Sequence, residues 1–335
     1  MYNSTENTKA DGFLNDGSLR ILGVLFKLVL NPALAAAGIC SNCINVLVFL
    51  RIGLSDGVTQ NFFILSLSDG LCCVIASVNS IAYILQQTVP PTTGLGAVEL
   101  LIQRVYWACF FAVTFPMNIS IVTTVVIAVV RCCCVAMPFR VKYLLTASRQ
   151  LVAILVSSGA VVGVLLYVFT PMRTVYLRNP ETNRLYAVLV GYRWATYTAF
   201  TSVTLYSSFT IVIGCVVILS ASLKKSFKFR ESSSGSSVGS ESDKGRDMRV
   251  VKTVVFVSVA FICCFLPHLT FTLLKVFMAE FSPQGRFKNE NQLFLMMNEA
   301  CLLISANMNI FIYLLCNTRY RTAFRAVVGK THTES

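Results

Sequence analysis

Long runs of apolar residues alternate with short polar segments along most of the chain. Five runs carry no Asp, Glu, Lys or Arg: 28–50, 105–130, 151–172, 194–223 and 253–274. Two further runs contain one acid each: 61–89 has Asp69 and 292–316 has Glu299. About 20 mainly apolar residues are needed to cross the hydrocarbon core of a bilayer. The pattern therefore predicts seven membrane spans.

Each span is expected to be helical, because unpaired backbone groups are costly in lipid and no segment alternates like a barrel strand. We predict an all-α membrane protein, a seven-transmembrane helix bundle followed by a short amphipathic helix. The predicted spans are 21–50, 59–88, 103–135, 149–171, 194–223, 248–277 and 291–316. The other predicted parts are an extracellular tail (1–20), a disordered Ser-rich inner loop (226–246) within the bundle (21–317), and an amphipathic helix with a short tail (318–335).

Composition agrees with a membrane protein. The chain is 55% hydrophobic and 13% charged, with a mean hydropathy of +0.69, whereas soluble domains are about 25% charged. The net charge of +13 lies in short segments between apolar runs, which is typical of membrane loops and does not indicate nucleic-acid binding. Most of the 13 cysteines fall in apolar runs as packing residues. No nucleophile, base or metal cluster indicates an enzyme.

Charge and a sequon indicate the orientation. If the amino terminus is outside, most Lys and Arg residues fall on the inner side, as the positive-inside rule requires. The glycosylation triplet Asn3-Ser4-Thr5 then lies in the outer tail. We therefore expect a multi-pass plasma-membrane protein with a cytoplasmic carboxyl terminus.

Two inner segments have a distinct composition. Residues 231–243 are rich in Ser and Gly, which is typical of a disordered linker. This linker is either a phosphate acceptor or a plain spacer. After the last span, 318–328 combines arginines with Tyr320, Phe324 and Val327, which suits a helix lying along the membrane surface and in contact with lipid.

Ionisable and polar residues at bilayer depth are expensive and often functional. Asp69 is the clearest case. Candidates to surround it are Asn42, Ser120, Ser305 and Asn309. Such a cluster is either a hydrated Na⁺ or proton site or a hydrogen-bonded packing core, and the spacing does not decide between them.

Several short motifs occur in order along the spans. They are Gly38-x-x-x-Asn42, Leu65-x-x-x-Asp69, Val130-Arg131-Cys132 with Pro138, Phe261-x-x-Cys264-Phe265-Leu266-Pro267, Asn309-Ile310-Phe311-Ile312-Tyr313 and Tyr320-Arg321. Their order and spacing resemble the rhodopsin-like (class A) G-protein-coupled receptors over essentially all seven helices. Segments 41–46 and 305–309 look like those of gastropod mollusc chemosensory receptors. Invertebrate FMRFamide-like peptide receptors are the neighbouring branch.

The resemblance implies roles for individual positions. Asp69, Ser120 and Asn309 match the family's sodium and water pocket, so a bound Na⁺ is the one cofactor expected. The matching activation switch consists of Arg131, Asp247, Phe265, Phe261, Ile121, Pro267, Asn309 and Tyr313. Within it, Arg131 meets the G protein and Asp247 is its ionic partner. Pro267 also bends its helix because it removes a backbone hydrogen bond.

The chain also departs from the family pattern. Val130 replaces the acid before Arg131, Ile310 replaces a proline in the seventh helix, and Tyr106 occupies the helix-three position of the family's disulfide. The resemblance then implies a looser resting state and a less constrained outer mouth.

Ligand candidates lie in the outer half of the bundle. By the resemblance, Leu303 replaces the retinal-linking lysine of opsins, and Val113 replaces the amine-binding aspartate of aminergic receptors. Glu299 is an acid without an evident partner: it either contacts a ligand or forms a salt bridge with Arg104, Arg173 or Lys275. The candidate ligand-binding residues are Glu299, Arg104, Val113, Phe265 and His268.

The resemblance implies a receptor that converts binding of a chemosensory small molecule or peptide into activation of a heterotrimeric G protein by outward movement of helix six. Kinase and arrestin are further partners through the Ser-rich loop. A Na⁺/H⁺-coupled transporter and a seven-helix ligand-gated channel are the alternatives. The transporter would usually show internal repeats, and the channel type carries its amino terminus inside.

Overall fold

The computed structural model describes residues 12–88, 96–136, 145–178, 185–191, 193–232, 241–282 and 285–329. The elements are α1 (Asp16–Val24), η1 (Leu25–Leu30), α2 (Asn31–Ile52), α3 (Gly57–Thr88), α4 (Gly96–Ala112), α5 (Thr114–Ala136), α7 (Ala147–Phe169), β1 (Arg173–Arg178), β2 (Leu185–Val190), α8 (Trp194–Ser232), α9 (Glu241–Phe277), α10 (Lys288–Cys316) and α11 (Thr318–Val328).

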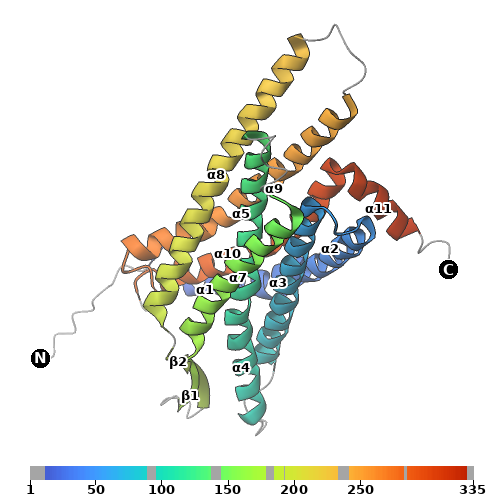
Figure 1. Ribbon diagram of the computed structural model, residues 1–335. Helices are drawn as coiled ribbons and strands as arrows, with labels where there is room; N and C mark the ends of the chain where they lie inside the picture. Colours follow the sequence, from blue (N-terminus) through green and yellow to red (C-terminus); the bar gives the residue numbers. More distant parts are fainter. Residues whose placement is uncertain are drawn as a thin grey trace, which may run out of the picture.

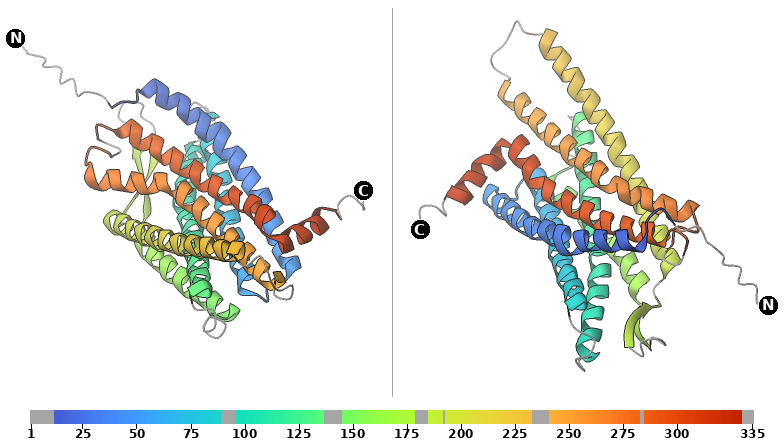
Figure 2. Two further views of the ribbon diagram at one scale, coloured as in Figure 1. Left: turned by 90° about the horizontal axis from the view of Figure 1, so that it is seen from above. Right: turned by 180° about the vertical axis from the view of Figure 1, so that it is seen from behind.

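The predicted seven-helix architecture is confirmed. Seven helices in the described part of the chain are long and apolar enough to cross a bilayer, the first formed by α1, η1 and α2 and the third by α4 and α5. Helix α2 packs on α3 and α10, α10 packs on α9, and α9 packs on α8 (Figure 1). Helix α5 contacts α3, α7, α8 and α9 and so lies at the centre, while Figure 2 shows α2 beside α10.

Proline interrupts two of the spans. In the first, Pro32 lacks an N–H, and the preceding turn widens into a π-helix in which the Asn31 N–H bonds the Phe26 carbonyl five residues back. In the third, Pro116 cannot bond the Ala112 carbonyl, and α4 gives way to α5 at Val113. These breaks change the faces that the amino-terminal halves of both spans present to the bundle.

A β-hairpin, which the sequence analysis did not predict, follows the fourth span. Strands β1 and β2 pair antiparallel with Arg173 opposite Val190, at the end of the bundle away from α11 (Figure 1). Gly191 ends the hairpin with a φ of +90°, and a Cβ there would lie 2.6 Å from the Pro171 carbonyl oxygen. Only glycine fits such a close approach without strain.

Helices α8 and α9 reach beyond their neighbours at the end of the bundle opposite the hairpin (Figure 1). Helix α8 continues to Ser232 and α9 begins at Glu241. Both ends of the segment 226–246, which was predicted to be a disordered loop, are therefore helical. Its central part, 233–240, lies outside the described residues, as does the Asn3 sequon.

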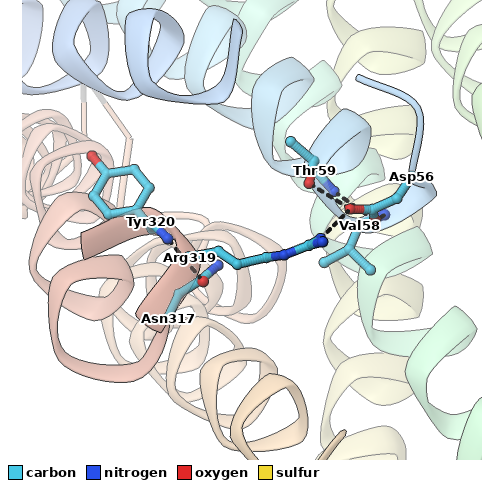
Figure 3. Close-up of polar contacts among 6 residues, drawn as sticks. All are labelled: Asp56, Val58, Thr59, Asn317, Arg319 and Tyr320. Carbon is cyan, nitrogen blue, oxygen red and sulfur yellow. Dashed lines mark hydrogen bonds and ion pairs between the residues drawn. The ribbon is translucent and has the colours of Figure 1, made fainter. Parts of the chain in front are cut away.

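Helix α11 is the predicted amphipathic helix after the last span. The Asn317 side chain caps it by accepting the Tyr320 N–H at 3.1 Å. Arg319 lies 3.8 Å from Asp56, whose carboxylate caps the start of α3 by accepting the backbone N–H of Val58 at 2.8 Å (Figure 3). The α11 helix is thereby tied to the turn between α2 and α3.

Helices approach one another closely at Gly38, where a Cβ would lie 2.4 Å from Cys73 Sγ and 3.1 Å from Asn307 Nδ2. We expect Gly38→Ala to lower the free energy of unfolding by about 1–3 kcal/mol through overpacking. A Cβ at Gly159 on α7 would instead meet open space, with no neighbouring side chain within 4 Å. Gly159→Ala should therefore raise the free energy of unfolding by up to about 1 kcal/mol, because alanine has the higher helix propensity. Equilibrium unfolding in mixed micelles measures both, and equal effects would contradict the close approach.

Candidate ligand cavity and polar core

A cavity of 710 Å³ opens at the end of the bundle where α1 and α10 begin. Ligand sites in proteins usually enclose about 300–1,000 Å³. Much of its wall is aromatic, with Trp107, Phe110, Phe111, Tyr197, Phe265 and Phe271 among the lining residues. The size and the wall suit a small organic molecule or a short peptide.

The polar centre of the cavity is an ion pair between Lys27 of η1 and Glu299 of α10. Both side chains line the cavity and are largely buried, with 10% of Lys27 and 19% of Glu299 exposed. The partner of Glu299 is thus Lys27, a residue that the sequence analysis did not single out. The π-helical turn before Pro32 contains Lys27 and fixes the direction in which this lysine enters the bundle.

None of the three bases that the sequence analysis considered for Glu299, which were Arg104, Arg173 and Lys275, forms the ion pair with it, and two of them contact aromatic rings instead. The Arg104 guanidinium lies 5.0 Å from the ring centre of Tyr176 on β1, and the Lys275 ammonium lies 4.3 Å from that of Phe271. Arg104 is exposed and does not line the cavity. The remaining ligand candidates, Glu299, Val113, Phe265 and His268, all line it.

The cavity floor joins the hydrophobic core below. Phe265 lines the cavity and is buried, with its ring centre 4.7 Å from that of Phe261, which in turn lies 5.7 Å from that of Phe209. Ile121 is buried in the same core. Pro267 lies within α9, two residues from Phe265, and leaves the Cys263 carbonyl without its helical N–H. A ligand that displaces Phe265 would therefore press on a helix already weakened at that turn.

Asp69 lies at the centre of a buried polar core beneath the aromatic floor. Its carboxylate accepts hydrogen bonds from the Ser120 hydroxyl at 2.7 Å and from Asn309 Nδ2 at 2.6 Å. The predicted grouping of these residues is thus present, and it joins α3, α5 and α10.

The other two candidates for this core bond elsewhere. Asn42 donates to the carbonyl oxygens of Gly38 at 2.9 Å and Ala306 at 3.1 Å, so it holds α2 against α10. Ser305 bonds the Cys264 thiol on α9. The hydrogen bonds that Asp69 receives from described residues come from Ser120 and Asn309.

Two tyrosines close the end of the bundle next to α11. The Tyr313 and Tyr320 side chains are fully buried, with ring centres 5.4 Å apart, and both pack on Phe49. The Tyr320 hydroxyl donates to Asn45 Oδ1 at 2.5 Å. Burial raises the pKa of the Tyr320 phenol above its usual value, so it remains a donor at neutral pH. Helix α11 is thereby joined to α2 from inside the bundle.

The expected contact between Arg131 and Asp247 is described only in part. Arg131 is half-buried near the carboxyl-terminal end of α5. Asp247 falls on α9, but its side chain lies outside the described residues, so the expected Arg131–Asp247 contact stays a prediction.

Lys27 shows what sequence reasoning missed. It interrupts an otherwise apolar stretch from Ile21 to Leu30, within the predicted first span. A lysine at such a depth requires a partner, and Glu299 was the conspicuous acid in the outer half of another span. Pairing the two intramembrane charges was the available signal.

None of the described cysteines, Cys109 included, forms a disulfide. No cluster of three or more His, Cys, Asp or Glu side chains able to hold a metal occurs in the described residues. No protein-family model matches the chain, and no curated protein matches it.

Proposed function

We propose that this chain is a G-protein-coupled receptor of the plasma membrane. It converts binding of an extracellular ligand, a chemosensory small molecule or a peptide, into activation of a heterotrimeric G protein. The amino-terminal tail lies outside the cell, and α11 lies along the cytoplasmic surface of the membrane. Activation occurs by outward movement of the inner half of α9.

The observation that carries this proposal is the double role of Phe265. One side of its ring forms part of the cavity floor, and its contact with Phe261 leads into the core between α8 and α9. A ligand that contacts Phe265 can therefore favour one packing of α9 over another. A ligand shifts such an equilibrium by its difference in affinity for the two states.

The polar core supplies the second link between α9 and the rest of the bundle. Asp69 joins α3, α5 and α10, and Ser305 of α10 bonds Cys264 of α9. Arg131 lies farther along α5 from Ser120, at the inner end where a G protein would bind. Movement of α9 therefore changes a network that reaches this arginine's helix.

A bound Na⁺ is part of the proposal and fits the polar core in part. Asp69 and Ser120 offer oxygen atoms, and Ser66 and Tyr313 carry further buried hydroxyls. Asn309 presents its nitrogen to Asp69, so its amide would have to turn to offer oxygen. Na⁺ bound there would favour the state in which the Asp69 carboxylate is charged and buried.

Two expected partners act at the inner surface. We propose that serines of 226–246 accept phosphates and so recruit arrestin after kinase action, because added charge creates sites for arginine-rich surfaces. These side chains lie outside the described residues.

A ligand screen in cells that express the chain with a promiscuous G protein tests the proposal. An active ligand is expected, and Arg131→Ala should reduce the response at least about tenfold while surface expression and ligand binding persist. Arg149→Ala, which removes an exposed inner arginine on α7, is the matched control and should retain the response.

Two results would contradict the proposal. The first is an undiminished response in Arg131→Ala, which would remove the coupling role of that residue. The second is an amino-terminal tag that is inaccessible to antibody on intact cells, since the ligand cavity would then face the cytosol.

A further inference from the structure

We propose that the outer cavity binds a zwitterionic head group, an ammonium and a carboxylate joined through one carbon as in a free α-amino acid. The head group would bind the Lys27–Glu299 pair, and an apolar or aromatic body attached to it would lie against the aromatic wall. The inference takes from the proposed function only that this cavity is the ligand site.

The ion pair retains unused hydrogen-bonding capacity that faces the cavity. Glu299 Oε2 accepts from the Lys27 ammonium, whereas Oε1 has no hydrogen-bond partner among the described residues. An ammonium carries three N–H donors, and Glu299 takes one. Both residues line the cavity. An acceptor for Lys27 and a donor for Glu299 are therefore what a ligand can add.

Several other polar side chains of the wall already have local partners. The hydroxyls of Thr114, Thr201 and Thr272 donate to carbonyl oxygens of their own helices at 2.6–2.9 Å. Asn291 donates to the Phe281 carbonyl at 3.2 Å. The polar part of a ligand is thereby directed to the pair and to the neighbouring Asn298, whose side-chain amide lines the cavity without a hydrogen-bond partner among the described residues.

Charge balance favours a zwitterion over a singly charged ligand. Lys27 and Glu299 together are neutral, and a buried charge without a partner is costly. A cation that bonded Glu299 would compete with Lys27, and an anion that bonded Lys27 would compete with Glu299. A zwitterion leaves no charge unpaired, because its carboxylate faces Lys27 while its ammonium faces Glu299.

The wall suits an aromatic body of the same ligand. Trp107, Phe110 and Phe111 extend from α4, and Phe271 lies on α9. Rings pack on such a surface in offset or edge-on arrangements. L-phenylalanine is therefore a suitable probe: it carries both the head group and a ring.

Thermal unfolding of the purified full-length chain with four matched probes tests the proposal. They are L-phenylalanine (zwitterion), 2-phenylethylamine (cation), 3-phenylpropanoate (anion) and N-acetyl-L-phenylalanine methylamide (neutral). Titrated to about 50 mM, well into the weak-binding range, L-phenylalanine is expected to raise the Tm by about 2–5 °C. The other three should raise it by less than half as much.

The anion arm also tests the two further lysines of the cavity wall, Lys275 beside Phe271 and Lys288 at the exposed rim. If these two lysines dominated binding, 3-phenylpropanoate would raise the Tm as much as L-phenylalanine or more. If 2-phenylethylamine raised the Tm as much as L-phenylalanine, Glu299 alone would account for binding. Either result, or no shift with L-phenylalanine, overturns the proposal.

A double variant separates the ligand role from folding. Lys27→Met/Glu299→Leu removes both charges and retains apolar volume, so the chain should still fold but lose the L-phenylalanine shift. Asp56→Asn/Arg319→Met removes the ion pair at the opposite end of the bundle and should retain the shift. A shift that persists in the first variant overturns the proposal.

The experiments distinguish failure of the zwitterion proposal from failure of the proposed receptor function. Unfolding with ligand needs no G protein, so a chain that binds the zwitterion but never couples would remove only the receptor function. A chain that couples to a ligand of another charge class, with equal shifts across the probes, would remove only this inference.

Discussion

Lys27→Met is expected to lower the free energy of unfolding by about 3–5 kcal/mol, because it leaves the Glu299 carboxylate largely buried with no cation beside it. Glu299 is 19% exposed and receives its one ion pair among the described residues from Lys27. Removing one partner costs more than the pair contributes, since the remaining charge retains its desolvation penalty. Equilibrium unfolding in mixed micelles measures the change.

The double variant Lys27→Met/Glu299→Leu supplies the control for that prediction. It should recover most of the lost stability, because well-packed apolar residues can replace a buried ion pair at little cost. Glu299→Gln alone should be destabilising as well, since it leaves the Lys27 ammonium without a carboxylate. A double variant as unstable as Lys27→Met would mean that the side-chain shapes, and not the charges, decide stability here.

The seven spans could be predicted because their signal is local. Each is a run of apolar residues of bilayer length, and lipid permits only helix for an isolated run. The ends of the spans were predicted less well. Residues 1–20 were predicted to be a tail, but the first helix begins at Asp16. Its cap is Asn15, whose Oδ1 accepts the Ser18 N–H at 2.7 Å. Capping at a polar boundary extends a helix beyond its apolar run.

Contacts between distant spans were predictable only where a motif implied them. Asp69, Ser120 and Asn309 were grouped through the resemblance, and they do bond one another. Ser305, four residues before Asn309, was expected in the same group but bonds Cys264 of α9. Spacing along one helix gives a shared face, but it does not decide which neighbouring helix each residue on that face meets.

The Lys27–Glu299 pair required information that spacing does not contain. The two residues are 272 positions apart, and several bases were available at the outer end. The choice among them depends on the rotation of the first span, which the π-turn before Pro32 changes. The hairpin was missed for a related reason: two six-residue strands in a long connection give a weak signal beside seven apolar runs.

Asp69→Ala is expected to cost about 3–5 kcal/mol of folding stability, combining a buried cavity with two donors that lose their acceptor. Ser120 Oγ and Asn309 Nδ2 both donate to this carboxylate, so the substitution also removes two hydrogen bonds that join α3 to α5 and α10. Asp69 is 4% exposed, and water cannot replace the carboxylate without entering the core. Equilibrium unfolding in mixed micelles measures the loss.

Asp69→Asn separates the charge from the hydrogen bonds. Its amide oxygen can accept from Asn309, while its NH₂ donates to Ser120 once that hydroxyl turns, so most of the stability lost in Asp69→Ala should remain. If Na⁺ binds at this carboxylate, replacing K⁺ with Na⁺ should raise the Tm of the unmodified chain and leave that of Asp69→Asn unchanged, because the amide offers the cation no charge. An Asp69→Asn chain as unstable as Asp69→Ala would show that the core depends on the charge itself, and equal Na⁺ effects in both chains would place the cation elsewhere.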